Sequence, residues 1–524
     1  MVIVPDLGTL DPMGYRPALI AAVGASLVLA ACTSSKHAAP AASAPGSSAA
    51  TSSAAASSPS VASSSAPLSA SAAASASAAA SSSSAATSSA SSSETPSPSA
   101  TAPAFPTAVW PTYHHDVART GNAGAVPAVS GLKVAAKASL DGAVYASPLV
   151  LRDTLGDLVI AATENNTLYA LRNNGSVVWS RHIGTPVNGS SLPCGNINPT
   201  GITGTPVYDP ATGLVFAVAF LSGDKHVLVA VKAETGTVAW TRPVDPPGSH
   251  ANVEQERGAM LLSGGKVWVP YGGLYGDCGP YHGYLVGIPT SGQGAAAIYQ
   301  VPSSREAGIW TPAGPSADAA GHVYVSVGNS AQTNPKAAYD MGDYVIELNG
   351  TTVVSFFAPA TWASENAQDL DLGTTGPVIL PTGQVFVAGK NGNAYLMKQG
   401  ALGGLGGKVP SIAVCTAFGG AAYSNGTIYI PCTDGVRAVH ISATAMTGSW
   451  HASPSGSPIV GGGAVLTVAP SSGTLFALDP GSGATKAQVA LGDSATRFAT
   501  PALAADGFAY VGTEHGKLVI VATS

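Results

Sequence analysis

The stretch Ser147–Trp179, SPLVLRDTLGDLVIAATENNTLYALRNNGSVVW, decides the fold of the chain. Its apolar, β-branched and aromatic residues fall in four short segments, Ser147–Val150, Leu158–Ala161, Thr167–Leu171 and Asn174–Trp179. Turn residues separate these segments, and each segment is too short for a helix of ordinary length. We therefore predict four antiparallel strands joined by turns.

The same unit recurs along the chain. Seven further units begin with small residues or proline, at Thr205-Pro206-Val207, Gly258-Ala259-Met260, Ala313-Gly314-Pro315, Gly376-Pro377-Val378, Gly419-Gly420-Ala421, Ser457-Pro458-Ile459 and Thr500-Pro501-Ala502. Repeats of four strands at this spacing are typical of propeller blades, which bury their faces only by stacking on one another. The sequence therefore predicts an all-β, eight-bladed β-propeller of four-stranded antiparallel blades over residues 104–524. Trp179, Trp240 and Trp450 fall in fourth strands, where a large ring can fill the gap between neighbouring sheets.

The last unit is incomplete, because the chain ends soon after its third strand, Lys517–Ile520. An unpaired strand edge is a liability that a closed ring removes. The segment Gly131–Leu140 precedes the first blade and has strand-like composition. We predict that it supplies the missing fourth strand and closes the ring.

Composition limits the classes of function. Charged residues are 10% of the chain, with 62 Gly and 39 Pro, which favours many short strands over long solvated helices. The formal net charge is −6 and no Lys/Arg cluster is present, so we expect no nucleic-acid partner. The sequence has no Gly-x-Ser-x-Gly elbow, Walker loop, His-Glu-x-x-His or Gly-x-Gly-x-x-Gly motif. Hydrolase, nucleotide-binding and zinc-protease functions are therefore less favoured.

Residues 1–31 are expected to be an export signal, because an apolar stretch ends in Leu29-Ala30-Ala31-Cys32. This pattern resembles the bacterial lipobox, which implies lipidation of Cys32. A plain signal peptide with a chance cysteine is the second interpretation. Acidic residues precede the first base, Arg16, although export signals usually begin with basic residues, so Met13 is a candidate translation start beside Met1.

Residues 32–103 are almost wholly Ser, Ala, Thr and Pro after the cysteine, and such a segment cannot bury enough apolar area to fold. We predict a lipidated Cys32 followed by a disordered linker. The folded part would then lie on the extracellular side of the cell membrane, held by a lipid anchor only. A tethered, closed ring needs no partner subunit, so we expect a monomer.

The remaining cysteines form an even set of four, as expected for an exported protein: Cys194, Cys278, Cys415 and Cys432. In a propeller, the connections between blades and the loops from second to third strands emerge at one end. All four cysteines fall in such loops. We predict the pairs Cys194–Cys278 and Cys415–Cys432, with the two other pairings and unpaired thiols as alternatives.

Units built around Leu-x-Ala-Leu-Asp, as at Leu475–Asp479, followed by Thr-Gly and Trp, resemble the pyrroloquinoline-quinone (PQQ) repeat. Quinoprotein dehydrogenases and the outer-membrane-assembly propeller lipoprotein share this repeat. The resemblance covers about Trp110 to Ser524, and Trp110–Asp116 and Gly308–Pro315 resemble segments of a secreted branch of these propellers. It implies the fold strongly and a reaction weakly, since one scaffold serves enzymes and scaffolding proteins.

The resemblance also implies candidate site residues. Gly328-Asn329 resembles the Gly-Asn ligand motif of quinoprotein dehydrogenases, which makes Asn329 a candidate ligand of Ca²⁺. Asp369-Leu370-Asp371 resembles the stretch that supplies their catalytic Asp, so Asp369 or Asp371 would remove the hydroxyl proton. Glu254 and Glu256 are the candidate Glu ligands of the metal. The adjacent cysteines of many such enzymes are absent here.

Three further residues, Arg257, Trp310 and Arg497, are candidates for contact with a bound cofactor on the loop-rich face. Ordinary polar loops with internally paired arginines are the alternative interpretation. We expect an envelope-anchored binding or scaffold module that takes a small molecule, a glycan or an envelope protein. The alternative function is a PQQ- and Ca²⁺-dependent dehydrogenase that oxidises an alcohol or a sugar.

Overall fold

The computed structural model describes residues 105–524. The predicted export signal, the lipidated Cys32 and the predicted linker lie outside the described residues. Within residues 105–524, no helix is both long and apolar enough to span a bilayer.

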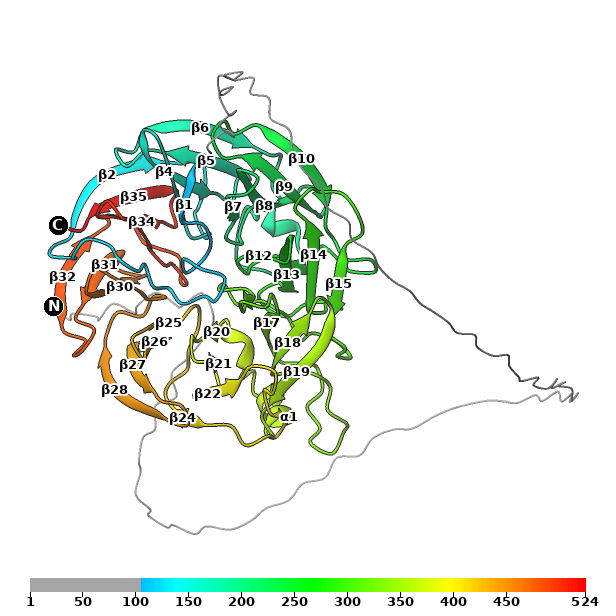
Figure 1. Cartoon of the computed structure of the whole chain (residues 1–524). Coiled ribbons are helices and arrows are strands. Elements are labelled where there is room, and N and C mark those ends of the chain that lie inside the picture. Colours follow the sequence, from blue (N-terminus) through cyan, green and yellow to red (C-terminus); the bar gives the residue numbers. More distant parts are fainter. Residues whose placement is uncertain (1–104) are drawn as a thin grey trace, which may run out of the picture. The chain divides into compact units, whose positions relative to one another are not determined.

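Eight antiparallel sheets stand around a common axis, as the sequence predicted (Figure 1). We number them as blades in chain order. Blade 1 contains β3 (Leu149–Asp153), β4 (Gly156–Ala162), β5 (Thr167–Leu171) and β6 (Val177–His182), and blade 2 contains β7 (Val207–Asp209), β8 (Leu214–Leu221), β9 (Lys225–Lys232) and β10 (Val238–Pro243). Blade 3 contains β12 (Leu261–Ser263), β13 (Lys266–Gly273), β14 (Tyr284–Pro289) and β15 (Ala297–Gln300). Blade 4 contains β16 (Ser316–Ala317), β17 (Val323–Val327), β18 (Tyr344–Asn349) and β19 (Thr352–Ala358).

Blade 5 contains β20 (Val378–Ile379), β21 (Gln384–Ala388), β22 (Asn393–Lys398) and β24 (Ser411–Ala413), and blade 6 contains β25 (Ala422–Ser424), β26 (Thr427–Cys432), β27 (Gly435–Ile441) and β28 (Met446–Ala452). Blade 7 contains β29 (Ile459–Gly461), β30 (Ala464–Ala469), β31 (Thr474–Leu478) and β32 (Thr485–Ala490). Blade 8 contains β33 (Ala502–Leu503), β34 (Phe508–Gly512), β35 (Lys517–Ala522) and β2 (Lys133–Ser139). Additional short strands join three blades: β1 (Thr107–Trp110), β11 (Glu254–Gln255) and β23 (Gly404–Leu405). The connections hold one short helix, α1 (Trp362–Ala367), and two 3₁₀ turns, η1 (Gly189–Ser191) and η2 (Leu372–Thr374).

The burial of each strand follows its distance from the axis. The second strand of blade 1, β4, is buried along almost its whole length, because neighbouring blades cover both of its faces. The fourth strand, β6, is mostly exposed and carries polar residues beside its apolar ones. Apolar clusters fill the gaps between adjacent blades, as between blades 1 and 2 and between blades 3 and 4. The core of the protein is therefore distributed around the ring.

The ring closes through its N-terminal strand. β2 pairs antiparallel with β35, with a register that runs from Lys133 opposite Ala522 to Ser139 opposite Lys517. This strand supplies the fourth position of blade 8 and confirms the closure predicted from Gly131–Leu140.

Tryptophans in three fourth strands dock on glycines of the next blade. A Cβ added to Gly236 would lie 2.6 Å from the ring of Trp179, and one added to Gly292 would lie 2.7 Å from Trp240. Trp450 packs in the same way on blade 7, where its indole N–H donates to Pro480. The predicted interblade packing of these rings is confirmed, and glycine is needed at the turns that receive them.

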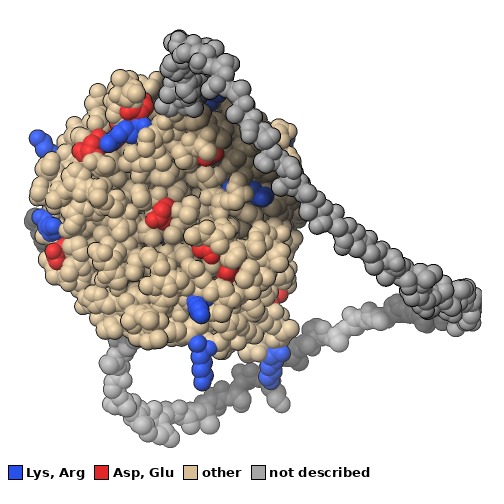
Figure 2. Space-filling model, viewed as in Figure 1, with Lys and Arg blue, Asp and Glu red and all other residues tan. Residues whose placement is uncertain are grey.

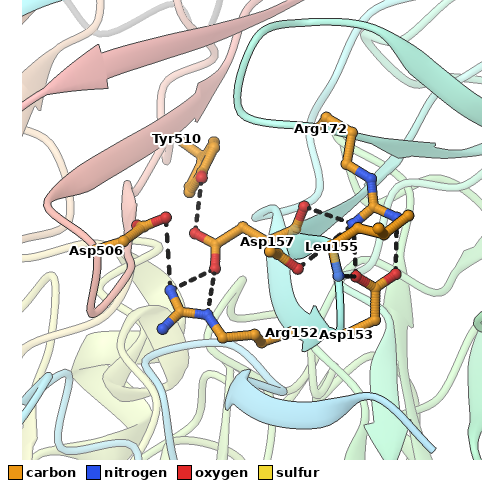
Figure 3. Close-up of polar contacts among 8 residues, drawn as sticks. Arg152, Asp153, Leu155, Asp157, Arg172, Asp506 and Tyr510 are labelled. Atoms are coloured by element: carbon orange, nitrogen blue, oxygen red, sulfur yellow. Dashed lines mark hydrogen bonds and ion pairs between the residues drawn. The ribbon is translucent and has the colours of Figure 1, made fainter.

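A polar network crosses the seam between blades 8 and 1 (Figure 3). The buried carboxylate of Asp157 accepts from Arg152 at 2.9 and 2.6 Å and from the hydroxyl of Tyr510 at 2.9 Å. Arg152 also pairs with Asp506 of blade 8 at 3.5 Å. We call these four residues the seam network. Because its members come from both ends of the ring sequence, it ties the last blade to the first.

The segment between β1 and β2 crosses the middle of the ring (Figure 1). We call residues 111–121 the axial plug. Its backbone carbonyls accept hydrogen bonds from the innermost strands of five blades, through the N–H groups of Tyr208, Ala317, Ile379, Tyr423 and Val460. The plug lies alongside these short strands: Ala317 and Ile379 are the last residues of their strands, and Tyr208, Tyr423 and Val460 are the middle residues of theirs.

Two buried side chains hold the axial plug in place. Arg119 is 1% exposed and donates to carbonyl oxygens of Tyr113, Met260 and Pro315. His114 stacks on Tyr113 and contacts the carbonyl oxygen of Ala421, and burial lowers the pKa of His114 to about 3. The histidine is therefore neutral at physiological pH.

Charged side chains are sparse on the surface. Figure 2 shows a face that is mostly uncharged, with acidic and basic residues scattered over it. That face offers no basic track for a nucleic-acid backbone.

Candidate functional site

The connections between blades converge at one end of the ring. In each blade the innermost strand begins at this end of the ring, and the second strand returns to it. The interblade connections and the loops from second to third strands therefore lie at the same end. We call this end the loop-rich face. It carries both disulfides, Cys194–Cys278 and Cys415–Cys432, with Cα separations of 6.1 and 5.7 Å. The predicted pairing of the cysteines is confirmed.

Three aromatic rings form a row on this face. Trp310, Phe418 and Phe498 come from three different interblade connections. The ring centroids of Trp310 and Phe418 are 6.4 Å apart, and those of Phe418 and Phe498 are 6.2 Å apart. The rings are tilted toward one another and offer π-faces to neighbouring groups.

Three cationic side chains lie over this row. Arg257 lies 5.0 Å from the centroid of Phe498, and Arg497 lies 4.7 Å from that of Phe418. Lys390 lies 5.7 Å from the ring of Trp310. We call the six side chains, Arg257, Trp310, Lys390, Arg497, Phe418 and Phe498, the axial cluster. It brings together the three residues that the sequence nominated for cofactor contact, Arg257, Trp310 and Arg497.

Arg257 has an unusual environment. Its guanidinium makes no hydrogen bond and no ion pair with any residue of the described range 105–524; its closest contact in the row is the Phe498 ring. Burial lowers the pKa of Arg257, while Tyr145 and Glu164 partly compensate. An arginine has five N–H donors, and a partly buried one normally pairs with a carboxylate. This side chain is therefore available to an anion.

Two buried carboxyl groups lie behind Arg257. Glu164 accepts from the N–H of Gly201 at 2.7 Å, and burial raises the pKa of Glu164 to about 7. Glu256 is 3% exposed, neither of its oxygens has a hydrogen-bond partner, and burial raises its pKa well above the usual range. The Glu256 carboxyl packs directly on Gly204, where a side chain would collide with it. Burial therefore disfavours the charged form of the Glu256 carboxyl group.

Asp371 lies at the opposite side of the cluster. One of its oxygens accepts from the backbone N–H of Asn329 at 2.8 Å, and the other pairs with Lys390. A Cβ added to Gly328 would lie 2.5 Å from Asp371 and 2.9 Å from the indole nitrogen of Trp310. The sequence motif Gly328-Asn329 is therefore in contact with the predicted catalytic Asp371.

Asp369 and Asp371 are not equivalent. Asp371 is buried, whereas the side chain of Asp369 is 65% exposed and pairs with Lys390 at 2.7 Å. Burial, and then Asp371, raise the pKa of Asp369 to about 6. Although burial lowers the pKa of Lys390, Asp371 and Asp369 outweigh it and raise that pKa above its ordinary value. Lys390 therefore stays charged and holds both carboxylates.

The predicted metal ligands Glu254, Glu256 and Asn329 each have their own contacts in the structure. Glu254 lies in β11, where the backbone of His250 approaches it at 3.4 Å, and burial raises the pKa of Glu254 to about 7. Glu256 faces Gly204 and Glu164. Calcium needs several oxygens converging on one point. No hydrogen bond or ion pair within residues 105–524 joins the glutamates to Asn329 or Asp371, and the metal site stays a prediction.

Sequence reasoning missed four residues of this face: Glu164, Lys390, Phe418 and Phe498. A positional signal exists for two of them. Phe418 and Phe498 lie within three residues before predicted unit starts, as Arg257 and Trp310 do, and a residue at that point of each repeat lies near the axis. Lys390 and Glu164 follow second strands, at the other kind of loop on this face.

Comparison with known proteins agrees with this architecture. Residues 133–255 match the family described as outer membrane protein assembly factor BamB. No curated protein matches the chain in sequence. Quinohemoprotein alcohol dehydrogenase from Comamonas testosteroni is similar in structure, with 15% identity, a TM-score of 0.60 and coverage of 79% of this chain and 80% of that chain.

Two more solved structures share the fold. A europium-containing methanol dehydrogenase has 15% identity, a TM-score of 0.60 and coverage of 79% of this chain and 98% of that one. BamB from Moraxella catarrhalis has 17% identity, a TM-score of 0.52 and coverage of 75% and 99%. At these identities the likeness concerns the fold, which the two dehydrogenases and BamB have in common.

Proposed function

We propose that this chain, a propeller of PQQ-type repeats, is a binding module whose axial cluster takes a small, flat, anionic molecule without transforming it. Arg257 carries the proposal, because its guanidinium is partly buried and has no anionic partner within 4.0 Å among residues 105–524. Leaving a desolvated cation unpaired is unfavourable, and a bound carboxylate or similar anion would remove that cost.

The surroundings of Arg257 define the shape of the ligand. The row Trp310, Phe418 and Phe498 offers aromatic faces to a planar molecule. Two further cations, Lys390 and Arg497, extend the positive edge of the row.

A quinoprotein dehydrogenase is the second candidate. The contact of Asp371 with Gly328-Asn329 and Trp310 favours it, and PQQ itself is a flat molecule with several carboxylates. The donor set does not fit the metal, however, because both oxygens of Asp371 are engaged by Asn329 and Lys390. We therefore derive no oxidation step for this chain and rank binding above catalysis.

PQQ is a suitable probe for both candidates. The full chain would be incubated with PQQ, with and without Ca²⁺, and desalted. Binding alone predicts retained quinone absorbance that does not depend on Ca²⁺, and no dye reduction with alcohols or sugars. Retention that requires Ca²⁺, together with dye reduction, would favour the dehydrogenase.

Arg257→Gln tests the role of the arginine. Loss of a charge-assisted contact of about 1.5–3 kcal/mol should weaken PQQ binding by about 10- to 100-fold. Arg242→Gln is the matched control, because Arg242 donates to Gly292 and Gly294 away from the cluster. Equal binding by the two variants, or no binding of PQQ or of simpler aromatic carboxylates by the unmodified chain, would contradict the proposal.

The cellular location is also a proposal. The sequence up to Cys32 supports export and lipidation, and two disulfides suit an oxidising compartment. Cys32→Ala should move the protein from the membrane fraction to the soluble fraction after cell breakage. An unchanged distribution would rule out the lipid anchor.

A further inference from the structure

A second group of titratable side chains lies far from the axial cluster, in blade 4. Asp318 and His322 flank the turn between β16 and β17, and Glu347 lies in β18. The turn is at the end of the ring opposite the loop-rich face, because it joins a first strand to a second. This group is the only set of three or more His, Cys, Asp or Glu side chains, within residues 105–524, whose ligand atoms lie within 4.8 Å of one another.

The three ligand atoms converge on one point. The Nδ1 atom of His322 lies 3.4 Å from Oδ2 of Asp318 and 3.1 Å from Oε1 of Glu347. His322 and Tyr324 are alternate residues, and Tyr324 is the direct strand partner of Glu347, so their side chains share a face of the sheet.

Backbone donors fix the orientation of both carboxylates. Oδ1 of Asp318 accepts from the N–H groups of Ala320 and His322, both at 2.9 Å, which closes the turn. Oε2 of Glu347 accepts from the N–H of Gly400 at 2.7 Å. In each carboxylate, one oxygen therefore accepts hydrogen bonds from the backbone and the other oxygen points toward His322.

A buried hydroxyl supports this arrangement from behind. Tyr324 donates to Oδ2 of Asp318 at 3.0 Å, and burial, followed by the Glu347 carboxylate, raises the pKa of Tyr324. The tyrosine stays protonated and orients the aspartate, as outer hydrogen bonds commonly do at metal sites.

The charge of the group is unbalanced. In the described part of the chain, Asp318 and Glu347 form ion pairs with His322 and with no lysine or arginine. Glu347 is 1% exposed, whereas the side chain of His322 is 28% exposed to solvent. With a neutral imidazole, two carboxylates share a site that lacks a permanent cation, and a divalent ion would supply the missing charge.

We propose that Asp318, His322 and Glu347 bind a divalent transition metal ion of the Zn²⁺ type, with water at the remaining positions. The imidazole nitrogen favours Zn²⁺ and similar ions over Ca²⁺ and Mg²⁺, which prefer oxygen ligands alone. The metal connects the turn after β16 to the middle of β18, so binding stabilises blade 4.

Titration calorimetry of the EDTA-treated full chain with Zn²⁺ alone tests this proposal. The unmodified chain should bind one Zn²⁺ per molecule at this site, and Zn²⁺ should raise its unfolding temperature. His322→Ala should weaken binding by at least about tenfold and abolish the thermal shift. Because His322 is partly exposed, the metal-free variant should unfold near the temperature of the unmodified protein.

Two further variants make the result decisive. Asp318→Asn keeps an acceptor for the turn but loses the charged ligand, so it should weaken Zn²⁺ binding while the fold persists. His451→Ala is the matched control, since His451 lies 3.8 Å from a single carboxylate, that of Asp434. Absence of stoichiometric Zn²⁺ binding, equal affinity in His322→Ala and His451→Ala, or tighter binding of Ca²⁺ than of Zn²⁺ would overturn the proposal. His322 would then serve as the counterion of the two carboxylates.

Discussion

The seam network of Figure 3 allows a quantitative test of how the ring holds together. Tyr510 of blade 8 donates to the carboxylate of Asp157 of blade 1 at 2.9 Å, and Asp157 is 1% exposed. Tyr510→Phe removes the hydroxyl donor, so a buried oxygen of the Asp157 carboxylate, which also pairs with Arg152, loses its hydrogen bond from Tyr510. A hydrogen bond to a charged group contributes about 1.5–3 kcal/mol, so we expect the free energy of unfolding to fall by about 2 kcal/mol.

Tyr208→Phe provides the matched control. Tyr208 is also 1% exposed, but its hydroxyl donates to a neutral acceptor, the carbonyl oxygen of Pro106, at 2.6 Å. Its loss should cost about 1 kcal/mol. Denaturant unfolding followed by tryptophan fluorescence measures both changes. For a folded unit of about 420 residues, the Tyr510 variant should unfold about 2 °C lower.

A double-mutant cycle separates the pairwise contribution from other effects of the substitution. Tyr510→Phe and Asp157→Asn should not be additive, and the coupling free energy should be about 1–2 kcal/mol. Equal losses for Tyr510→Phe and Tyr208→Phe, or an additive cycle, would refute the claim that this hydrogen bond ties blade 8 to blade 1.

Three further predictions concern the packing, the axial site and the closure. Gly236→Ala should lower the free energy of unfolding by about 2–3 kcal/mol, because a Cβ at this position meets an indole ring at 2.6 Å. Gly223→Ala is the control, since Gly223 is also left-handed but has no atom near its Cβ position, and it should cost about 1 kcal/mol in the same denaturant unfolding experiment. Burial raises the pKa of Glu164 from 4.5 to about 7, so the Glu164 carboxyl group stabilises the folded state fully below pH 4.5 and loses this contribution as the pH rises through 7. The free energy of unfolding should change by on the order of 3 kcal/mol over this range. Glu164→Gln should abolish the change. The same protonation removes a negative charge beside Arg257, so the affinity for an anionic probe should increase as the pH falls through 7 in the unmodified chain and stay flat in Glu164→Gln. A chain that begins at Asp141 lacks β2 and the axial plug and should unfold several degrees lower by calorimetry; stability equal to that of residues 105–524 would contradict ring closure.

The blade register could be read from the sequence because each unit begins at small residues or proline beside the axis. Thr205-Pro206 and Ser457-Pro458 each stand directly before an innermost strand, where space is limited and the chain turns. The closing strand was predictable because the last unit lacks its fourth strand. The disulfides followed once the loops that share a face were known.

The axial plug was not predictable in the same way. Its residues do not repeat, and His114, His115 and Arg119 adopt left-handed backbone conformations that long-range contacts must support. Arg119 bonds to carbonyl oxygens of Met260 and Pro315, which are far from it in sequence and carry no recognisable signal. Such contacts depend on the assembled ring.

The axial cluster was predictable in part. Trp310, Arg257 and Arg497 were nominated because their loops share a face, but the aromatic row depends on three connections meeting at the axis. Glu254 and Glu256 are two residues apart and were nominated together. Their environments differ, since Glu254 lies near His250 and Glu256 packs on Gly204. Spacing alone does not distinguish these positions.

The pairing of β2 with β35 also sets the order of folding events during synthesis. β2 lies near the N-terminal end of the folded unit, and it has to wait for β35, the last strand, before either strand edge is paired. Until then, growing blades have no permanent neighbour at the open side of the ring. A nascent chain therefore cannot complete its fold, and chaperones that bind unpaired strand edges should associate with it until the C-terminal residues have been synthesised.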